Sequence, residues 1–174
     1  MKTALRWLMA IMIAMAIAAC QPKPKPGETA PVAEPTRPPV VTEAAPDPHD
    51  YTDARNFDNP ESLLSKRVIY FDFDESVVKP EYRPIVSAHA AYLAAHSGAS
   101  VTLEGHADER GTREYNLGLG ERRGNSAMGL MSAQGARGNQ LTVVSYGEER
   151  PVCRVSDEDC WSQNRRVEIV YTSR

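Results

Sequence analysis

Regular patterns of apolar and polar residues run through the part of the chain that follows Pro60. Alternating apolar side chains predict strands over residues 67–73, 99–106, 141–146 and 165–172. Apolar residues at helical spacing predict helices over 80–97 and 115–134, and a short helical turn is expected over 157–162. The order of these elements predicts an α+β fold, an α/β sandwich in which a mixed four-stranded sheet carries the two main helices on one face.

The second predicted helix presents two different faces. Its core stripe consists of small and apolar residues, namely Leu117, Gly120, Gly124, Ala127, Met128 and Met131. Asn116, Leu119 and Arg123 lie within about 60° of one another on a separate face. This second face begins at the amino terminus of the helix, where unpaired backbone N–H groups favour an anion. It is therefore a candidate binding face, and an ordinary solvated face is the alternative interpretation of the helix pattern alone.

The composition changes sharply before the folded part. Nine of the thirteen prolines fall in residues 21–50, which contain few aromatic side chains. Such a segment cannot bury enough apolar surface to offset the entropy lost on ordering. We therefore predict a Pro-rich disordered linker over residues 20–59 and one folded domain over residues 60–174.

The amino terminus has the features of an export signal. Lys2 and Arg6 precede a short apolar run that ends at Ile17, and this run is shorter than the about 20 residues that cross a bilayer. A transmembrane anchor is thus the weaker alternative. The residues Ile17-Ala18-Ala19-Cys20 resemble a bacterial lipobox, which implies a signal peptide over residues 1–19 and a covalently lipidated Cys20. Several acyl chains would hold the protein to a membrane durably. The residue after the cysteine is Gln21 and not an acidic residue, which resembles the pattern of lipoproteins that are exported onward to the outer membrane.

The remaining cysteines, Cys153 and Cys160, form an even pair in a compartment that permits disulfides. A disulfide is the favoured interpretation, with free thiols as the alternative. Two cysteines alone do not complete a metal site, and no metal site is predicted.

The net charge of −3 becomes −5 when residues 1–19 are removed, because that segment contains Lys2 and Arg6 and no acidic residue. This charge argues against a nucleic-acid partner.

The run from Glu104 to Arg123 closely resembles the signature of the OmpA-like family, and within it the peptidoglycan-associated lipoproteins. Further landmarks stand in the family's order, namely Tyr70-Phe71-Asp72-Phe73-Asp74, Val144-Ser145-Tyr146-Gly147-Glu148 and Gln163-Asn164-Arg165-Arg166-Val167-Glu168. The resemblance covers residues 67–172. One departure is the glycine content of the second helix, including Gly124 where the family usually has alanine. Each interior glycine costs about 0.5–1 kcal/mol relative to alanine, so either backbones pack closely there or the helix is locally soft.

The resemblance implies recognition of meso-diaminopimelate in the peptide stem of peptidoglycan. By family position, Asp108 would face the ammonium of this residue and Arg123 its carboxylate. The other implied contacts are Phe73, Asp74, Asn116, Leu119 and, as a further contact, Arg110. No cofactor is implied besides the lipid on Cys20. The competing interpretation of Asp108 and Arg123 is an ordinary surface ion pair, which contributes little energy.

The resemblance also implies a place in the cell. The chain would tether the outer membrane to the wall, with its domain facing the periplasm, as part of the Tol-Pal system in envelope integrity and cell division. TolB would be its periplasmic partner and TolA a further one, and TolB would bind a surface that overlaps the wall-binding face. A stator-type wall anchor uses the same kind of domain, but it would need a transmembrane helix in place of the lipobox.

An enzyme is the other hypothesis. Ile69, Phe71 and Phe73 share one face of the first predicted strand, and Asp72 and Asp74 share the other. Paired carboxylates near a wall polymer can cleave glycosides. Neither aspartate has the apolar surroundings that a general acid needs, and a domain of this size offers a groove rather than a cleft. We therefore expect binding without catalysis.

Overall fold

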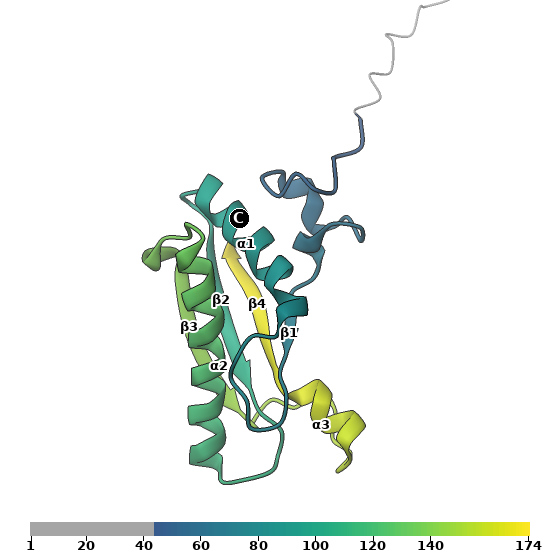
Figure 1. Ribbon diagram of the computed structural model, residues 1–174, viewed down its shortest axis with the longest axis vertical. Coiled ribbons are helices and arrows are strands. Elements are labelled where there is room, and N and C mark those ends of the chain that lie inside the picture. Colours follow the sequence, from purple (N-terminus) through teal and green to yellow (C-terminus); the bar gives the residue numbers. More distant parts are fainter. Residues whose placement is uncertain (1–43) are drawn as a thin grey trace, which may run out of the picture. The chain divides into compact units, whose positions relative to one another are not determined.

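A four-stranded mixed sheet forms the centre of the fold, in the spatial order β1-β4-β2-β3 (Figure 1). The computed structural model describes residues 44–174, so the predicted signal segment, Cys20 and the first part of the predicted linker lie outside the described residues. β4 (Arg166–Ser173) pairs antiparallel with both β1 (Val68–Tyr70) and β2 (Ser100–His106). β2 pairs parallel with β3 (Leu141–Gly147). The predicted mixed sheet is confirmed.

The helices α1 (Arg83–Ala95) and α2 (Arg113–Ala133) share one hydrophobic core with the sheet. Leu93 of α1, Met131 of α2 and Leu103 of β2 are each fully buried in that core. α2 runs along β2 and β3 (Figure 1). Short 3-10 helices precede α1 and β3, and the short helix α3 (Glu158–Asn164) confirms the helical turn predicted before β4. The two-layer arrangement confirms the predicted α+β class.

The first strand is shorter than predicted. Ile69 and Phe71 are buried as expected, but Phe73 is 57% exposed. The chain leaves the sheet after Phe71 and turns, with the Glu75 N–H donating to the carbonyl oxygen of Asp72 at 3.2 Å. Asp74 adopts a positive φ of 58° in this turn. Asp72 and Asp74 therefore belong to a loop, and the prediction that they share one face of a strand is wrong.

The folded unit begins earlier than residue 60. Phe57 lies at the end of a short 3-10 helix (Ala54–Phe57) and is only 3% exposed. Its ring contacts those of Tyr92 and Tyr171 edge-on, with centroids 4.7 and 4.6 Å away. Asn56 is buried as well and donates from its amide to the carbonyl oxygens of Asp47 and Asp50. The predicted linker boundary at residue 59 was too late, because composition does not reveal a single aromatic anchor inside a polar segment.

The two faces predicted for α2 form one buried surface. Asn116, Leu119 and Arg123 are buried together with Ala127 and Met131 along the same side of the helix. Successive steps of four residues rotate a helix position by only about 40°, so the candidate binding face continues into the core stripe. The prediction of a separate face was therefore wrong, and the site stands directly on the core.

Close backbone packing explains part of the glycine content of α2. A Cβ atom at Gly120 would lie 2.4 Å from the Ser145 hydroxyl oxygen and 2.8 Å from the carbonyl oxygen of Gly105 in β2. A Cβ at Gly124 would lie 2.6 Å from a methyl carbon of Val143. Gly129, in contrast, has open space where its Cβ would be.

Within residues 44–174, no helix has the length and apolar character to cross a membrane.

Candidate functional site

A pocket of about 180 Å³ opens at the edge of the sheet where β1 and β2 end and β4 begins. Its nine lining residues are Phe73, Asp74, Asp108, Arg110, Gly111, Tyr115, Asn116, Leu119 and Arg123. All seven residues predicted for recognition are among them. They come from three elements, namely the β1–α1 loop, the β2–α2 loop and the first turns of α2. Gly111 and Tyr115 were not predicted, although both lie inside the quoted family signature.

Arg123 of α2 lines the pocket and holds its loops in place. This residue is fully buried, and its guanidinium donates to three backbone carbonyl oxygens. Nε donates to Glu75 at 2.8 Å, Nη1 to His106 at 2.8 Å and Nη2 to Asp72 at 3.0 Å. Burial lowers the pKa of Arg123 to about 10, so it stays charged at neutral pH. Arg123 thus fastens the β1–α1 loop to the end of β2 and places a positive charge at the pocket.

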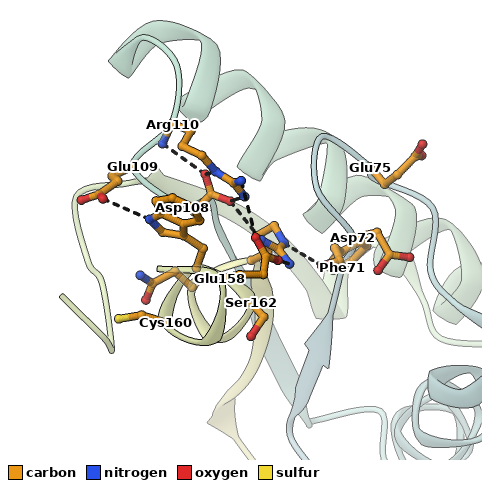
Figure 2. A network of polar contacts seen from close by, with 12 residues as sticks. Phe71, Asp72, Glu75, Asp108, Glu109, Arg110, Glu158, Cys160 and Ser162 are labelled. Carbon is orange, nitrogen blue, oxygen red and sulfur yellow. Dashed lines mark hydrogen bonds and ion pairs between the residues drawn. The ribbon is translucent and has the colours of Figure 1, made fainter. Parts of the chain in front are cut away.

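Asp108 supplies a negative charge to the pocket, and this residue is 4% exposed. Its carboxylate accepts hydrogen bonds from the guanidinium groups of Arg110 and Arg165, at 2.6 Å from Arg110 Nη2 and 3.3 Å from Arg165 Nη1 (Figure 2). Burial raises the pKa of Asp108, but the hydrogen bonds from the two arginines outweigh it and hold the pKa below its usual value. Asp108 is therefore ionised at neutral pH.

The interpretation of Asp108 and Arg123 as an ordinary surface ion pair is wrong. Both residues are buried, and the ion-pair partners of Asp108 are Arg110 and Arg165. Arg165 is a functional candidate that the sequence did not single out, although it lies in the quoted Gln163–Glu168 landmark. It stands directly before β4 and also donates to the carbonyl oxygen of Phe71 at 3.1 Å.

Arg110 is held by aromatic rings as well as by charge. Its guanidinium carbon lies 4.0 Å from the ring centre of Phe73 and 4.1 Å from that of Trp161 in α3. Glu158, also in α3, lies 3.5 Å from Arg110 Nη1. Figure 2 shows Arg110, Asp108 and Glu158 converging at one point above α3. The pocket wall therefore depends on a helix that contributes no lining residue of its own.

Two residues of the first turn of α2 position the loops around the pocket. The Asn116 amide donates to the backbone carbonyl of Asp108 at 3.1 Å and also to the Glu148 carboxylate. The Tyr115 hydroxyl donates to the Asp74 carboxylate. Thr112 caps the helix by accepting from the Tyr115 N–H at 3.2 Å. The helix start thus fixes both acidic residues of the pocket.

A disulfide joins Cys153 and Cys160, as predicted. Cys160 lies in α3, whose first turn is capped by the Asp157 carboxylate. Trp161, the residue after Cys160, donates from its indole N–H to Glu109 at 3.0 Å (Figure 2). The disulfide therefore ties α3, whose Trp161 ring contacts Arg110, to the loop that precedes this helix. Among residues 44–174, no cluster of three or more His, Cys, Asp or Glu side chains could hold a metal ion.

The fold and the pocket together define an α+β domain with a pocket of mixed charge at one edge of its sheet. The chain belongs to the OmpA family, whose sequence profile matches residues 70–165. The predicted resemblance is thereby confirmed at the level of the family.

Curated relatives narrow the comparison. The chain is 52% identical over 108 residues to the peptidoglycan-associated lipoprotein of Pseudomonas aeruginosa, a match that covers 62% of this chain and 64% of the relative. It is 44% identical over 102 residues to the protein of the same name from Brucella melitensis, covering 59% of this chain and 61% of that protein. The chain thus spans less than two thirds of the length of either relative.

Solved structures agree with this placement. The crystal structure of the peptidoglycan-associated lipoprotein from Burkholderia pseudomallei superposes with a TM-score of 0.65 at 41% identity, covering 67% of this chain and 98% of that chain. The C-terminal domain of Helicobacter pylori MotB has a TM-score of 0.57 at 18% identity, covering 62% of this chain and 84% of that one. The second likeness shows a shared fold.

Proposed function

We propose that this chain is an outer-membrane lipoprotein that binds peptidoglycan non-covalently and tethers the membrane to the cell wall. The pocket carries the proposal, because two carboxylates and two guanidinium groups line one cavity of about 180 Å³. The meso-diaminopimelate of the peptide stem bears an ammonium and a carboxylate on one end. A ligand end with both charges matches a pocket wall with both charges.

The size of the pocket supports a single side-chain end as the ligand. Pockets that enclose a drug-sized molecule measure about 300–1,000 Å³, and this one is smaller. In this proposal Asp108 receives the ammonium and Arg123 the carboxylate. The three hydrogen bonds of Arg123 to carbonyl oxygens leave two of its five N–H groups for a ligand. Phe73 and Leu119 line the pocket beside them and would contact the methylene groups.

The cellular setting of the proposal rests on the lipobox and on the relatives. A lipid on Cys20 would anchor the chain to the outer membrane, with the domain in the periplasm, and no further cofactor is proposed. The relatives named peptidoglycan-associated lipoprotein support this setting. We place the chain in the Tol-Pal system, with TolB as partner and TolA as a further one, in envelope integrity and cell division. If TolB uses the same face, TolB and a soluble muropeptide will compete for the domain.

We propose binding without catalysis. A glycosidase needs a protonated carboxylic acid as general acid, whereas the pKa of Asp108 is held low by two arginines. Asp72 forms an ion pair with Lys79 at 2.6 Å and points away from Asp108 on the β1–α1 loop (Figure 2). The carboxylates near the pocket are thus engaged by cations or by the Tyr115 hydroxyl rather than left to protonate a leaving group.

Co-sedimentation with purified diaminopimelate-type sacculi tests the proposal. Residues 44–174 are mixed with sacculi, with and without free meso-diaminopimelate, and the pelleted fraction is measured. We expect pelleting that free meso-diaminopimelate suppresses and that Asp108→Ala and Arg123→Ala abolish in folded protein. Glu81→Gln and Arg83→Ala, at exposed positions outside the pocket, are the matched controls. Wild-type protein that stays in the supernatant would overturn the proposal and make the protein partner primary.

A further inference from the structure

The carboxylate of Asp108 has no free acceptor position. Oδ1 accepts from the backbone N–H of Arg110 and from its Nε, each at 3.1 Å. Oδ2 accepts from Arg110 Nη2 at 2.6 Å and from Arg165 Nη1 at 3.3 Å. Two carboxylate oxygens offer about four lone-pair positions, and the chain's own donors fill them. A ligand ammonium can reach Asp108 only by replacing one of these donors.

Arg110 is the donor that can leave. The Arg110 side chain is 30% exposed, whereas the Arg165 side chain is 7% exposed. Arg165 is fixed from three directions, because it also donates to the Phe71 carbonyl oxygen and to Glu158. Arg110 has a second partner close by, since its Nη1 lies 3.5 Å from the 61% exposed Glu158 carboxylate. A short rotation can therefore transfer Arg110 from Asp108 to Glu158 without leaving its charge unpaired.

We propose that the Arg110 guanidinium is an internal cation that occupies the ammonium position at Asp108 in the free protein. This inference rests on the proposed function and adds a specificity element to it. A ligand ammonium takes the place of Arg110 on Asp108, and Arg110 moves onto Glu158. A ligand that carries a carboxylate but no cation does not displace Arg110, so Asp108 stays closed to it. Arg110 thereby selects for ligand ends that bear both charges.

Trp161 reports directly on this displacement. The guanidinium carbon of Arg110 lies 4.1 Å from the centre of the Trp161 ring and 4.0 Å from the centre of the Phe73 ring. Trp161 is the single tryptophan among residues 44–174, so the intrinsic fluorescence of the domain comes from this ring. Removing a cation from the face of an indole changes its electrostatic surroundings. Trp161 does not line the pocket, so a change in its emission on ligand binding identifies a movement of Arg110.

Calorimetric titration of residues 44–174 with a soluble meso-diaminopimelate tripeptide tests the inference. The variants are Arg110→Ala and Arg110→Met, the second of which keeps an unbranched side chain between the two rings. Apparent affinity falls in proportion to the fraction of molecules with an open site. We therefore expect both variants to bind about tenfold more tightly than wild type, the result when Arg110 closes about nine sites in ten. Arg113→Met, at an exposed arginine outside the pocket, should bind as wild type does.

The outcomes separate the inference from the proposed function. Unchanged or weaker binding by Arg110→Met would overturn the inference and leave peptidoglycan binding intact. Failure of wild type and variants alike to bind would overturn both. In wild type we expect Trp161 emission to change with ligand and to saturate at the calorimetric Kd, and in Arg110→Met we expect no such change. Constant emission at saturating ligand in the wild type would also overturn the displacement.

Discussion

Arg123 of α2 donates through Nε to the backbone carbonyl oxygen of Glu75, 2.8 Å away in the β1–α1 loop. The residue proposed to bind a ligand carboxylate is therefore also the residue that holds one wall of the pocket. Its other two hydrogen bonds reach Asp72 in the same loop and His106 at the end of β2. Substitution of Arg123 will affect stability and recognition together, and experiments on this position must measure both.

The first prediction concerns this double role. Arg123→Ala removes the hydrogen bonds from this side chain to the carbonyl oxygens of Glu75 and His106 and one of the two donors to the Asp72 carbonyl oxygen. Each unsatisfied buried group costs about 1–3 kcal/mol. We expect the free energy of unfolding to fall by about 3 kcal/mol or more, measured by urea denaturation. The neighbouring Arg122 is exposed, and Arg122→Ala should stay within about 0.5 kcal/mol of wild type. Equal stability of the two variants would contradict the structural role of Arg123.

The second prediction uses the glycines of α2. Gly120→Ala places a Cβ against the Ser145 hydroxyl and the Gly105 backbone, and overpacking of this kind costs about 1–3 kcal/mol. Gly129→Ala meets open space and should stabilise the helix by about 0.5–1 kcal/mol. Thermal unfolding of the two variants should therefore shift in opposite directions. An increase in Tm for both variants would show that the backbone around Gly120 yields to the added Cβ atom.

The third prediction is a dependence of stability on pH. Burial lowers the pKa of His89 and of His106 to about 4, from a usual value of 6.5. Between these pH values the unfolded chain binds more protons than the folded chain, so stability falls as the pH is lowered from 6.5 to 4. The full loss amounts to up to about 3 kcal/mol for each histidine.

Urea denaturation at pH 7, 5.5 and 4.5 measures this loss. His89→Gln should flatten the dependence because it removes one of the two buried imidazoles, whatever its effect on stability at pH 7. His49→Gln, at a side chain that is 82% exposed, is the matched control. A pH dependence that is the same in His89→Gln and in wild type would contradict the assignment to this residue.

The fourth prediction concerns the disulfide. Cys153 and Cys160 are seven positions apart, and closing so short a loop in the unfolded chain contributes about 2–3 kcal/mol on the chain-entropy relation. Reduction should lower the Tm, and hydrogen exchange should show that protection is lost first around α3. The Cys153→Ser, Cys160→Ser double variant should not respond to the reductant. A Tm that does not change on reduction of the wild type would contradict a stabilising role.

Much of the architecture was predictable from local patterns. The strand pattern of Ser100–His106 and the helical spacing of Arg113–Ala133 appear in the order of residues, because side chains alternate in strands and recur about every 3.6 residues in helices. The family signature from Glu104 to Arg123 likewise contains five of the seven predicted recognition residues that line the pocket, and the Tyr70–Asp74 landmark contains the other two, Phe73 and Asp74. The disulfide followed from the even number of cysteines that remain after Cys20.

Tertiary contacts decided the remainder. Phe57 belongs to the core because its ring packs against those of Tyr92 and Tyr171, which lie far along the chain. The composition of the residues around Phe57 does not predict these contacts. The pairing of Asp108 with Arg165 joins residues 57 positions apart and depends on β4 lying next to β2. The sequence by itself determined the order of the elements, the family and seven of the nine residues that line the pocket, since these follow from local spacing and from the family motifs. Only the folded chain decided which charges are already paired, because pairing depends on which strands lie side by side.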